Sequence, residues 1–247
     1  MRRLVRNQKG QFVIIAAMLV ALMMISLSPL LHEAATYYTH EPWEEYLSLI
    51  GGLELNSQRL TELSLVNYSQ TGNQSILGGY LNQWQVDLSQ IYPGRGMLLA
   101  YNLKNGTVGL HGTNIDYTSG LCRNWNQKSS YSSAKVQYGL DMASVGLTGY
   151  RYEVTVHLNL TILQVDTSNK QINVTVGQEE GLPVDNLGKN NFNVTSGSTS
   201  ISITSVTQTY DPSNTLIYVI ECGQSFSKPV DVIVVDQRGI VVVSRFS

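Results

Sequence analysis

The chain has 247 residues, of which 43% are apolar, which is enough for one large domain or two ordinary ones plus an anchor and excludes wholesale disorder. Charged residues make up only 14%, whereas 25 Ser, 18 Thr and 18 Asn supply most of the polarity, as suits a secreted or cell-surface protein. The net charge of -2 argues against a general nucleic-acid-binding protein, so no nucleic acid is expected among the partners.

The N-terminus combines a basic leader, residues 1–10, with an apolar segment. The bases of the leader, with no acid among them, are Arg2, Arg3, Arg6 and Lys9. Phe12–Ile25 follows without a polar side chain, and a helix over residues 11–31 is long enough to span a bilayer. Because basic flanks stay in the cytoplasm, the sequence predicts a single-pass protein of the cell membrane with a cytoplasmic N-terminus and an extracellular C-terminal domain.

Three interpretations of this segment compete. A buried core helix is disfavoured by the four bases beside the charge-free run. An ordinary signal peptide could be cut after the small residues Ser26 and Ser28, but Pro29 should hinder that cut. The third interpretation is a segment that is processed before the apolar run, or simply kept as an anchor.

The motif Lys9-Gly10-Gln11-Phe12, followed by an apolar helix, resembles the class III signal of archaeal type IV pilin-like proteins. The resemblance covers residues 1 to about 31 and implies cleavage between Gly10 and Gln11 by a prepilin-type peptidase. It also implies that the retained helix anchors the subunit and self-associates in the core of a filament. Ile15 stands where many family members carry a Glu associated with subunit docking, which keeps a permanent anchor open as the alternative.

Helical periodicity predicts an antiparallel helical pair over residues 32–93. The first helix starts at Trp43 and is expected to kink at Gly51-Gly52, and residues 67–74 are predicted to form the turn. Apolar side chains near one face of the first helix are Tyr46, Leu49, Ile50, Leu53, Leu60 and Leu63. Those at helical spacing in the second helix are Ile76, Leu77, Tyr80, Leu81, Trp84, Leu88 and Ile91. The aromatic side chains of the pair are expected to pack in the core.

Residues 94–149 are predicted to form a mixed β region. Residues 97–103 and 107–110 flank Lys104-Asn105-Gly106, and Asn-Gly is a strong signal for a tight hairpin. Residues 113–133 are polar, and their pattern predicts neither a helix nor a strand. Residues 136–147 are apolar enough to form a strand.

Residues 150–247 are predicted to form an immunoglobulin-like β-sandwich. Apolar and polar residues alternate over residues 150–165, which predicts a long strand with one buried and one solvated face. Six further strands are expected at residues 171–176, 191–195, 200–207, 215–221, 230–235 and 240–246. The segment from about Gln171 resembles the immunoglobulin-like repeats of bacterial and archaeal surface proteins. The predicted fold class is therefore α+β: a transmembrane or pilin-like helix, a helical stalk, and an antiparallel β region that ends in the sandwich.

No constellation in the sequence points to catalysis, a cofactor or a metal. The histidines lack metal-ligand spacing, and His157 falls on the predicted solvated face of its strand. Glu179, Glu180 and Asp185 cluster around a turn, where we expect a solvated acidic loop rather than a calcium site. The sequence thus indicates that the protein is not an enzyme.

Two kinds of modification are expected outside the membrane. Cys122 and Cys222 are the minimum for one disulfide bridge, which would tie the polar region before the long strand to the sandwich; two unrelated buried thiols are the alternative. Glycosylation is expected at one or more of the six Asn-x-Ser/Thr sites, three in predicted turns and three on outward positions of strands: Asn67, Asn73, Asn105, Asn159, Asn173 and Asn193.

These features together predict a membrane-anchored surface protein with a structural or adhesive function, most simply a pilin-like filament subunit. The alternative is a permanently anchored surface module whose sandwich binds a receptor or the cell envelope. An enzyme is the least favoured class.

Overall fold

The structure, a computed structural model, describes residues 17–29, 43–92, 97–103, 106–110, 113–117, 119–142 and 147–247. The chain divides into two compact units, Met1–Leu53 and Glu54–Ser247. In the first unit, residues 17–29 are helical and their large apolar side chains are exposed. Within the described residues, no helix is both long enough and apolar enough to cross a membrane. The rest of the predicted membrane segment, residues 11–16 and 30–31, lies outside the described residues.

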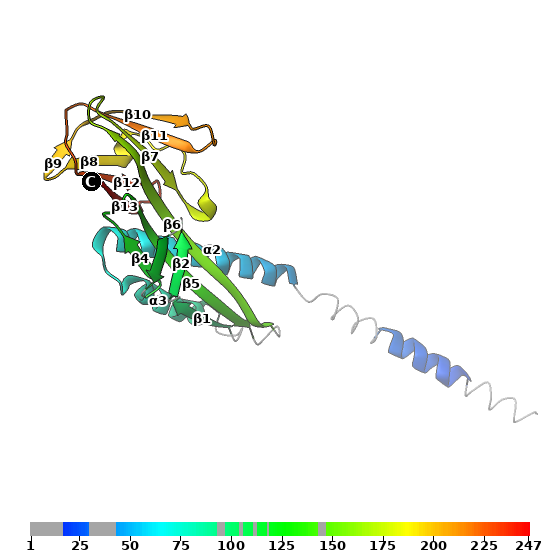
Figure 1. The fold of residues 1–247 in the computed structure, drawn as a ribbon. Coiled ribbons are helices and arrows are strands. Elements are labelled where there is room, and N and C mark those ends of the chain that lie inside the picture. The colour runs from blue at the N-terminus through cyan, green and yellow to red at the C-terminus, as the bar shows by residue number, and fades with distance from the viewer. Residues whose placement is uncertain are drawn as a thin grey trace, which may run out of the picture. The chain divides into compact units, whose positions relative to one another are not determined.

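Two longer helices follow, in agreement with the predicted pair (Figure 1). Helix α2 (Trp43–Thr71) begins in the first unit and ends in the second, and α3 (Ile76–Ile91) lies wholly in the second. Helix α2 continues through Gly51-Gly52 and through Asn67, so the turn predicted for residues 67–74 begins only after Thr71. The helix ends at Gly72, whose φ of 76° is left-handed and whose N–H donates to Tyr68 O at 2.8 Å.

The second unit is mainly antiparallel β-structure. Its strands are β1 (Met97–Leu103), β2 (Gly106–Leu110), β3 (Thr113–Tyr117), β4 (Leu121–Asn124), β5 (Ser129–Met142), β6 (Leu147–Asp166), β7 (Gln171–Gly177), β8 (Phe192–Ser196), β9 (Thr199–Ile201), β10 (Ile203–Tyr210), β11 (Leu216–Cys222), β12 (Val230–Val235) and β13 (Val241–Phe246). The large sheet has the order β1-β5-β6-β7-β11-β10, with β4 also paired to β5. The small sheet has the order β13-β12-β8-β9, and β2 pairs with β3.

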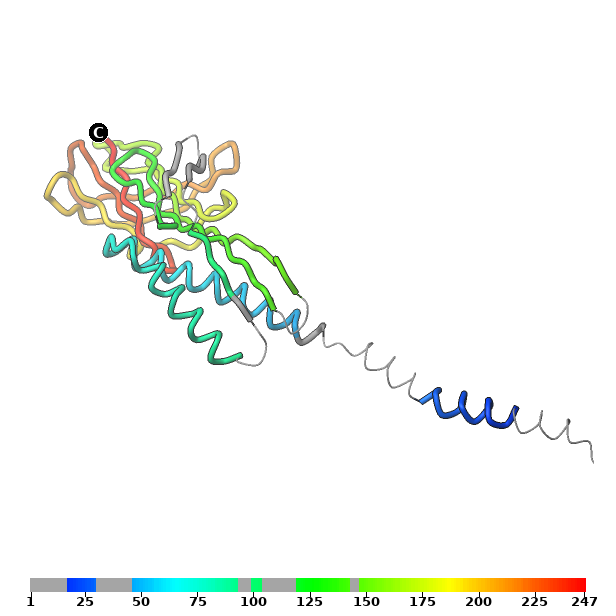
Figure 2. The backbone as a smooth tube through the Cα atoms, turned by 90° about the horizontal axis from the view of Figure 1, so that it is seen from below, coloured from blue at the N-terminus to red at the C-terminus, as the bar shows by residue number. Residues whose placement is uncertain are grey.

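One face of the large sheet is covered by two different layers. At one end of β5 and β6, the Tyr152 hydroxyl contacts Ser57 Oγ of α2 at 2.5 Å, and the Tyr138 hydroxyl contacts Thr61 Oγ1 at 2.9 Å. At the other end, β13 of the small sheet packs on β5 and β6, and Ser244 Oγ donates to Leu160 O at 2.7 Å. Figures 1 and 2 show the long β5–β6 pair running from one layer to the other. The unit is therefore a mixed α+β fold with antiparallel sheets, compatible with a β-sandwich at the end away from the helices.

The pairing of the early strands differs from the predicted hairpin. Strand β1 pairs with β5 and β2 pairs with β3, so β1 and β2 are not partners. The register places Leu99 opposite Leu140, and both side chains are buried. A two-stranded hairpin could not bury Leu99 in this way, so the long central strand is the better partner. Strand β5 also begins seven residues before the predicted residue 136.

The buried face of helix α2 mixes small polar residues with large ones, because Leu65 and Tyr68 are buried beside Ser57 and Thr61. Ser57, Thr61 and Ser64 are fully buried, while Leu63 keeps 57% of its surface exposed. The tyrosines of β5 and β6 explain this orientation, because their buried hydroxyl groups need partners that Ser and Thr supply. The apolar face predicted for the second half of α2 is therefore not the face that contacts the sheet.

The long strand β6 also differs from its predicted pattern. Its residues 156–160 are all buried, including His157 and Asn159, so the solvated face expected there is wrong. The loop after β7 covers His157, and Asn159 lies over Gly177, where an added Cβ would be 2.5 Å from Asn159 Oδ1. The predicted domain boundary at residue 150 falls within β6, inside one hydrogen-bonded sheet.

Candidate functional site

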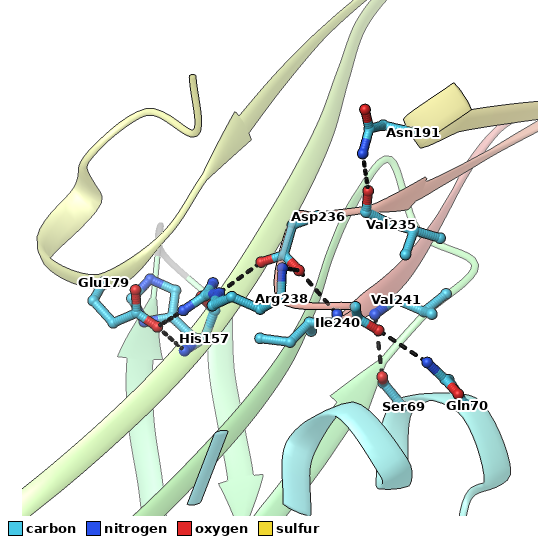
Figure 3. Close-up of polar contacts among 11 residues, drawn as sticks. Ser69, Gln70, His157, Glu179, Asn191, Val235, Asp236, Arg238, Ile240 and Val241 are labelled. Atoms are coloured by element: carbon cyan, nitrogen blue, oxygen red, sulfur yellow. Dashed lines mark hydrogen bonds and ion pairs between the residues drawn. The ribbon is translucent and has the colours of Figure 1, made fainter. Parts of the chain in front are cut away.

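The most highly organised polar cluster surrounds Arg238, in the turn between β12 and β13 (Figure 3). Arg238 Nη1 donates to Glu179 Oε1 at 2.7 Å, and Nε donates to Asp236 Oδ2 at 2.7 Å. Glu179 lies in the short 3-10 helix η2 (Glu179–Gly181) after β7. The Asp236 side chain is 2% exposed and the Arg238 side chain 21%, so the cluster is largely withdrawn from water.

This cluster closes the end of the β6–β7 ladder. The last cross-strand pair is Asn159 with Gly177, beyond which the chain turns away into η2. The backbone N–H of His157 then donates to Glu179 Oε1 at 2.8 Å, and the His157 carbonyl accepts from Arg238 Nη2 at 3.2 Å. Two side chains thus take the place of a neighbouring strand at His157, as the backbone groups of a buried residue require.

Asp236 organises the turn that carries Arg238. Its Oδ1 accepts from the backbone N–H groups of Arg238 at 3.1 Å and Ile240 at 2.9 Å. Gly239 completes the turn with a φ of 93°, a conformation that L side chains rarely adopt. A Cβ at this position would lie 3.3 Å from Val66 Cγ1 of α2, so glycine also permits the close approach to the helix.

Helix α2 is bonded to the same turn. Ser69 Oγ accepts from the backbone N–H of Val241 at 3.1 Å, and Gln70 Nε2 donates to Gly239 O at 3.1 Å. Figure 3 shows Ser69 and Gln70 reaching the turn from the helix, while Glu179 and His157 approach Arg238 from the opposite side. The turn therefore connects α2, the large sheet and the small sheet, and the chemistry of the cluster is that of a structural junction.

Two groups in and beside the cluster have raised pKa values. Burial alone lowers the pKa of Arg238, but its hydrogen bonds to Glu179 and Asp236 outweigh burial and raise the pKa above its usual value. Burial raises the pKa of Glu62, on α2; Arg238 opposes this rise, and the carboxylates of Asp236 and Glu179 reinforce it. Glu62 is therefore the member of this neighbourhood whose negative charge is least well accommodated.

Glu62→Gln should raise the midpoint of thermal unfolding at about pH 7. A raised native-state pKa means that protonated Glu62 stabilises the fold below the unfolded-state pKa of about 4.5. This contribution is lost as the pH rises through the native-state pKa. The glutamine variant should therefore gain stability at neutral pH and lose that advantage below about pH 4, measured by thermal denaturation at both values. Glu180→Gln, at an exposed position nearby, serves as the control; an advantage of Glu62→Gln that persists at low pH would contradict the assignment.

The structure does not bring the two cysteines together. Cys122 lies on β4 and Cys222 ends β11, and the described residues form no disulfide between them. The order β4-β5-β6-β7-β11 puts four strand spacings between the cysteines, roughly 19 Å, whereas a bridge needs Cα atoms within about 7 Å. The predicted bridge is wrong because three strands, β5, β6 and β7, separate the two strands that carry the cysteines. Burial raises the pKa of Cys222, which keeps its thiol protonated.

The predicted glycosylation sites fall in different environments. Asn73 and Asn193 are exposed, the first in the α2–α3 turn and the second on β8. Asn67 is half-buried within α2, with its Nδ2 3.5 Å from the Tyr80 hydroxyl. Asn159 is buried, which corrects its predicted outward position.

Asn173 is half-buried on β7, and Asn105 lies outside the described residues. The accessible sequons of the described chain are thus Asn73 and Asn193.

The remaining predicted sites are not assembled into a binding centre. Glu179 is engaged by Arg238 and by the His157 amide, which differs from the solvated position expected from the sequence, whereas Glu180 and Asp185 are exposed as expected. A search of the described residues finds no group of three or more His, Cys, Asp or Glu that could hold a metal. The predicted cleavage site, Gly10 and Gln11, lies outside the described residues.

Asp236-Gln237-Arg238-Gly239 lies between two predicted strands, residues 230–235 and 240–246, and nothing in the sequence marks it as the centre of a cluster. The sequence shows only a charged pair, Asp236 and Arg238, in a turn between two apolar strands. Residues in such turns are usually solvated, so the pair does not indicate a buried cluster. The partners of Arg238 come from segments far apart in the chain, so no local pattern announces them. Comparison of the chain with family models, curated proteins and solved structures finds no match in any of the three.

Proposed function

We propose that the protein is a membrane-anchored, outward-facing structural or adhesive surface protein, and specifically a pilin-like filament subunit. The observation that carries the proposal is Lys9-Gly10-Gln11 placed directly before a charge-free run, which matches a signal cut ahead of its apolar helix. The helix over residues 17–29 adds support, because its large apolar side chains are 53–71% exposed. A helix that is apolar all round needs lipid or other protein to cover it.

The second unit is suited to display rather than to catalysis. Its two antiparallel sheets support an immunoglobulin-like sandwich, the architecture of many cell-surface domains. Its principal polar cluster is occupied in joining three layers, with each charged group of the Arg238–Glu179–Asp236 set held by another. The sandwich would lie outside the cell, with the N-terminal helix as anchor and, after processing, as the self-associating element of a filament.

The mature N-terminus tests the proposal. Mass spectrometry of the N-terminal peptide, from protein isolated in the membrane fraction of cells that contain a prepilin-type peptidase, should identify Gln11 as the first residue. Gly10→Leu should abolish the cut and leave residues 1–10 in place, because the peptidase requires a small residue there. Detection of Met1 in the unaltered protein would refute the pilin-like route and favour the permanently anchored binding module, the alternative that Ile15 supports.

A further inference from the structure

Helices α2 and α3 leave an apolar groove on the side turned away from the sheet. Its apolar lining consists of Leu60, Leu63, Tyr80 and Trp84, and its volume is about 390 Å³. Leu63 is 57% exposed, and Ile91, two turns beyond Trp84 on α3, is 64% exposed. Part of the apolar face that the sequence predicts for α2, including Leu63, is therefore exposed to water in this groove. Such a surface is typical of an interaction site.

Charged groups of opposite sign stand at one level of this groove. The helices are antiparallel, and Asn67 Nδ2 lies 3.5 Å from the Tyr80 hydroxyl, which sets their alignment. Leu60 lies seven residues before Asn67 on α2, and Asp87 lies seven residues after Tyr80 on α3. In antiparallel helices these two residues are at the same level, with Arg59 adjacent to Leu60. Arg59 and Asp87 both line the groove, and neither forms an ion pair with another described residue.

We propose that this groove binds the same groove of a second copy, around a two-fold axis parallel to the two helices. That rotation lays α2 of one copy over α3 of the other. It places Leu63 against the partner's Trp84, with Leu60 about one turn away on one side and the partner's Tyr80 about one turn away on the other. At the level of Arg59 and Asp87, each charge then faces its opposite on the second copy, and symmetry forms the pair twice.

Charge complementarity selects a second copy over an unrelated partner, because the groove supplies both members of each ion pair. The aromatic centre fits the residue types that dominate binding energy at interfaces, and the charges at its rim fix the register. The direction of the axis rests on the proposed function. An axis parallel to the helices places the N-terminal ends of both α2 helices at the same end of the dimer, as two chains anchored in one membrane require. The pairing itself stands whether or not the leader is cleaved.

Leu63→Glu tests the groove in the full-length protein. Light scattering after size-exclusion chromatography in a mild detergent should show a dimer for the unaltered chain and a monomer for Leu63→Glu, which places a charge in the apolar centre. Leu182→Glu, at a position 53% exposed on a distant loop, is the matched control and should remain dimeric. Thermal denaturation should show that both variants are folded.

A charge-reversal cycle tests the orientation. Arg59→Asp and Asp87→Arg should each weaken the dimer about tenfold, because each sets like charges against one another. The double variant should recover the original affinity, while Lys189→Glu, an exposed reversal elsewhere, should leave it unchanged.

Ala17→Phe combined with Ala21→Phe alters the N-terminal helix and should leave this pairing intact. A monomeric unaltered chain, a dimer insensitive to Leu63→Glu, or a double reversal without recovery would each overturn the proposal. None of these results depends on whether Gln11 or Met1 is the mature N-terminus, so this proposal and the proposed function can fail separately.

Discussion

Arg238→Met should lower the free energy of unfolding by about 3 kcal/mol, the cost of leaving buried charges without their partner. Methionine keeps much of the length of the side chain but donates nothing to Glu179, to Asp236 or to the His157 carbonyl. The loss includes the end of the β6–β7 ladder as well as the ion pairs. Chemical denaturation monitored by circular dichroism measures the difference.

The chain offers a matched control for this variant. Arg245 Nε donates to Asp231 Oδ1 at 2.6 Å, but its side chain is 44% exposed, so Arg245→Met should lower the free energy of unfolding much less than Arg238→Met. Arg238→Met combined with Glu179→Met should be less damaging than the sum of the two single changes, because the double variant leaves neither charge stranded. Equal costs for Arg238→Met and Arg245→Met would contradict the role of the cluster.

Tyr138→Ala should lower the free energy of unfolding by about 4 kcal/mol, as expected for deleting a large aromatic side chain from a packed core. Tyr138 is fully buried between α2 and the sheet. Its ring stacks on Tyr152 with centroids 5.1 Å apart and meets Trp84 edge-on at 6.2 Å. Both helices therefore contact the sheet through this one side chain, and equilibrium unfolding of the variant should show their joint loss of support.

Tyr138→Phe separates the ring from its hydroxyl group. This change should cost about 1 kcal/mol, because Thr61 Oγ1 still donates to Ser57 O. Burial raises the pKa of Tyr138, so its stabilising contribution is complete below the unfolded-state pKa of about 10 and declines above it. The phenylalanine variant should then lose less stability than the unaltered protein as the pH rises above about 10. Tyr210→Ala, at an exposed position, is the control for Tyr138→Ala. An equal loss of unfolding free energy in both variants would contradict the prediction for Tyr138→Ala.

The β-strands and the helical pair were predictable because their signals are local. Alternation along β6 and the six later segments indicates strand structure directly, and α3 ends at Ile91, two residues before the limit predicted for the helical pair. Partner choice was not local. The Asn-Gly signal at residues 105–106 suggested a hairpin, but burial of Leu99 favours pairing of β1 with the distant strand β5.

The residues of the junction illustrate what periodicity leaves out. His157 occupies a polar position in an alternating strand, and only the return of the chain at Glu179 and Arg238 buries it. The buried face of α2 is a second case: periodicity marks Leu63 as apolar core, whereas Ser57 and Thr61 are buried beside Leu65 and pair with tyrosine hydroxyl groups of the sheet. Both outcomes depend on long-range partners.

The continuous β5–β6 pair also determines how the second unit carries mechanical load. Helix α2 is fastened to one end of these strands through Ser57 and Thr61, and β13 is fastened to the other end through Ser244. Tension between the helix and the small sheet is therefore shared between the direct hydrogen bonds of Ser69 and Gln70 to the β12–β13 turn and the β5–β6 pair, whose transverse hydrogen bonds are strained together, in shear, instead of being opened one by one. The unit would then resist stretching and rupture in a single cooperative event. A pulling force on the sandwich would therefore be transmitted to α2 with little extension of the chain.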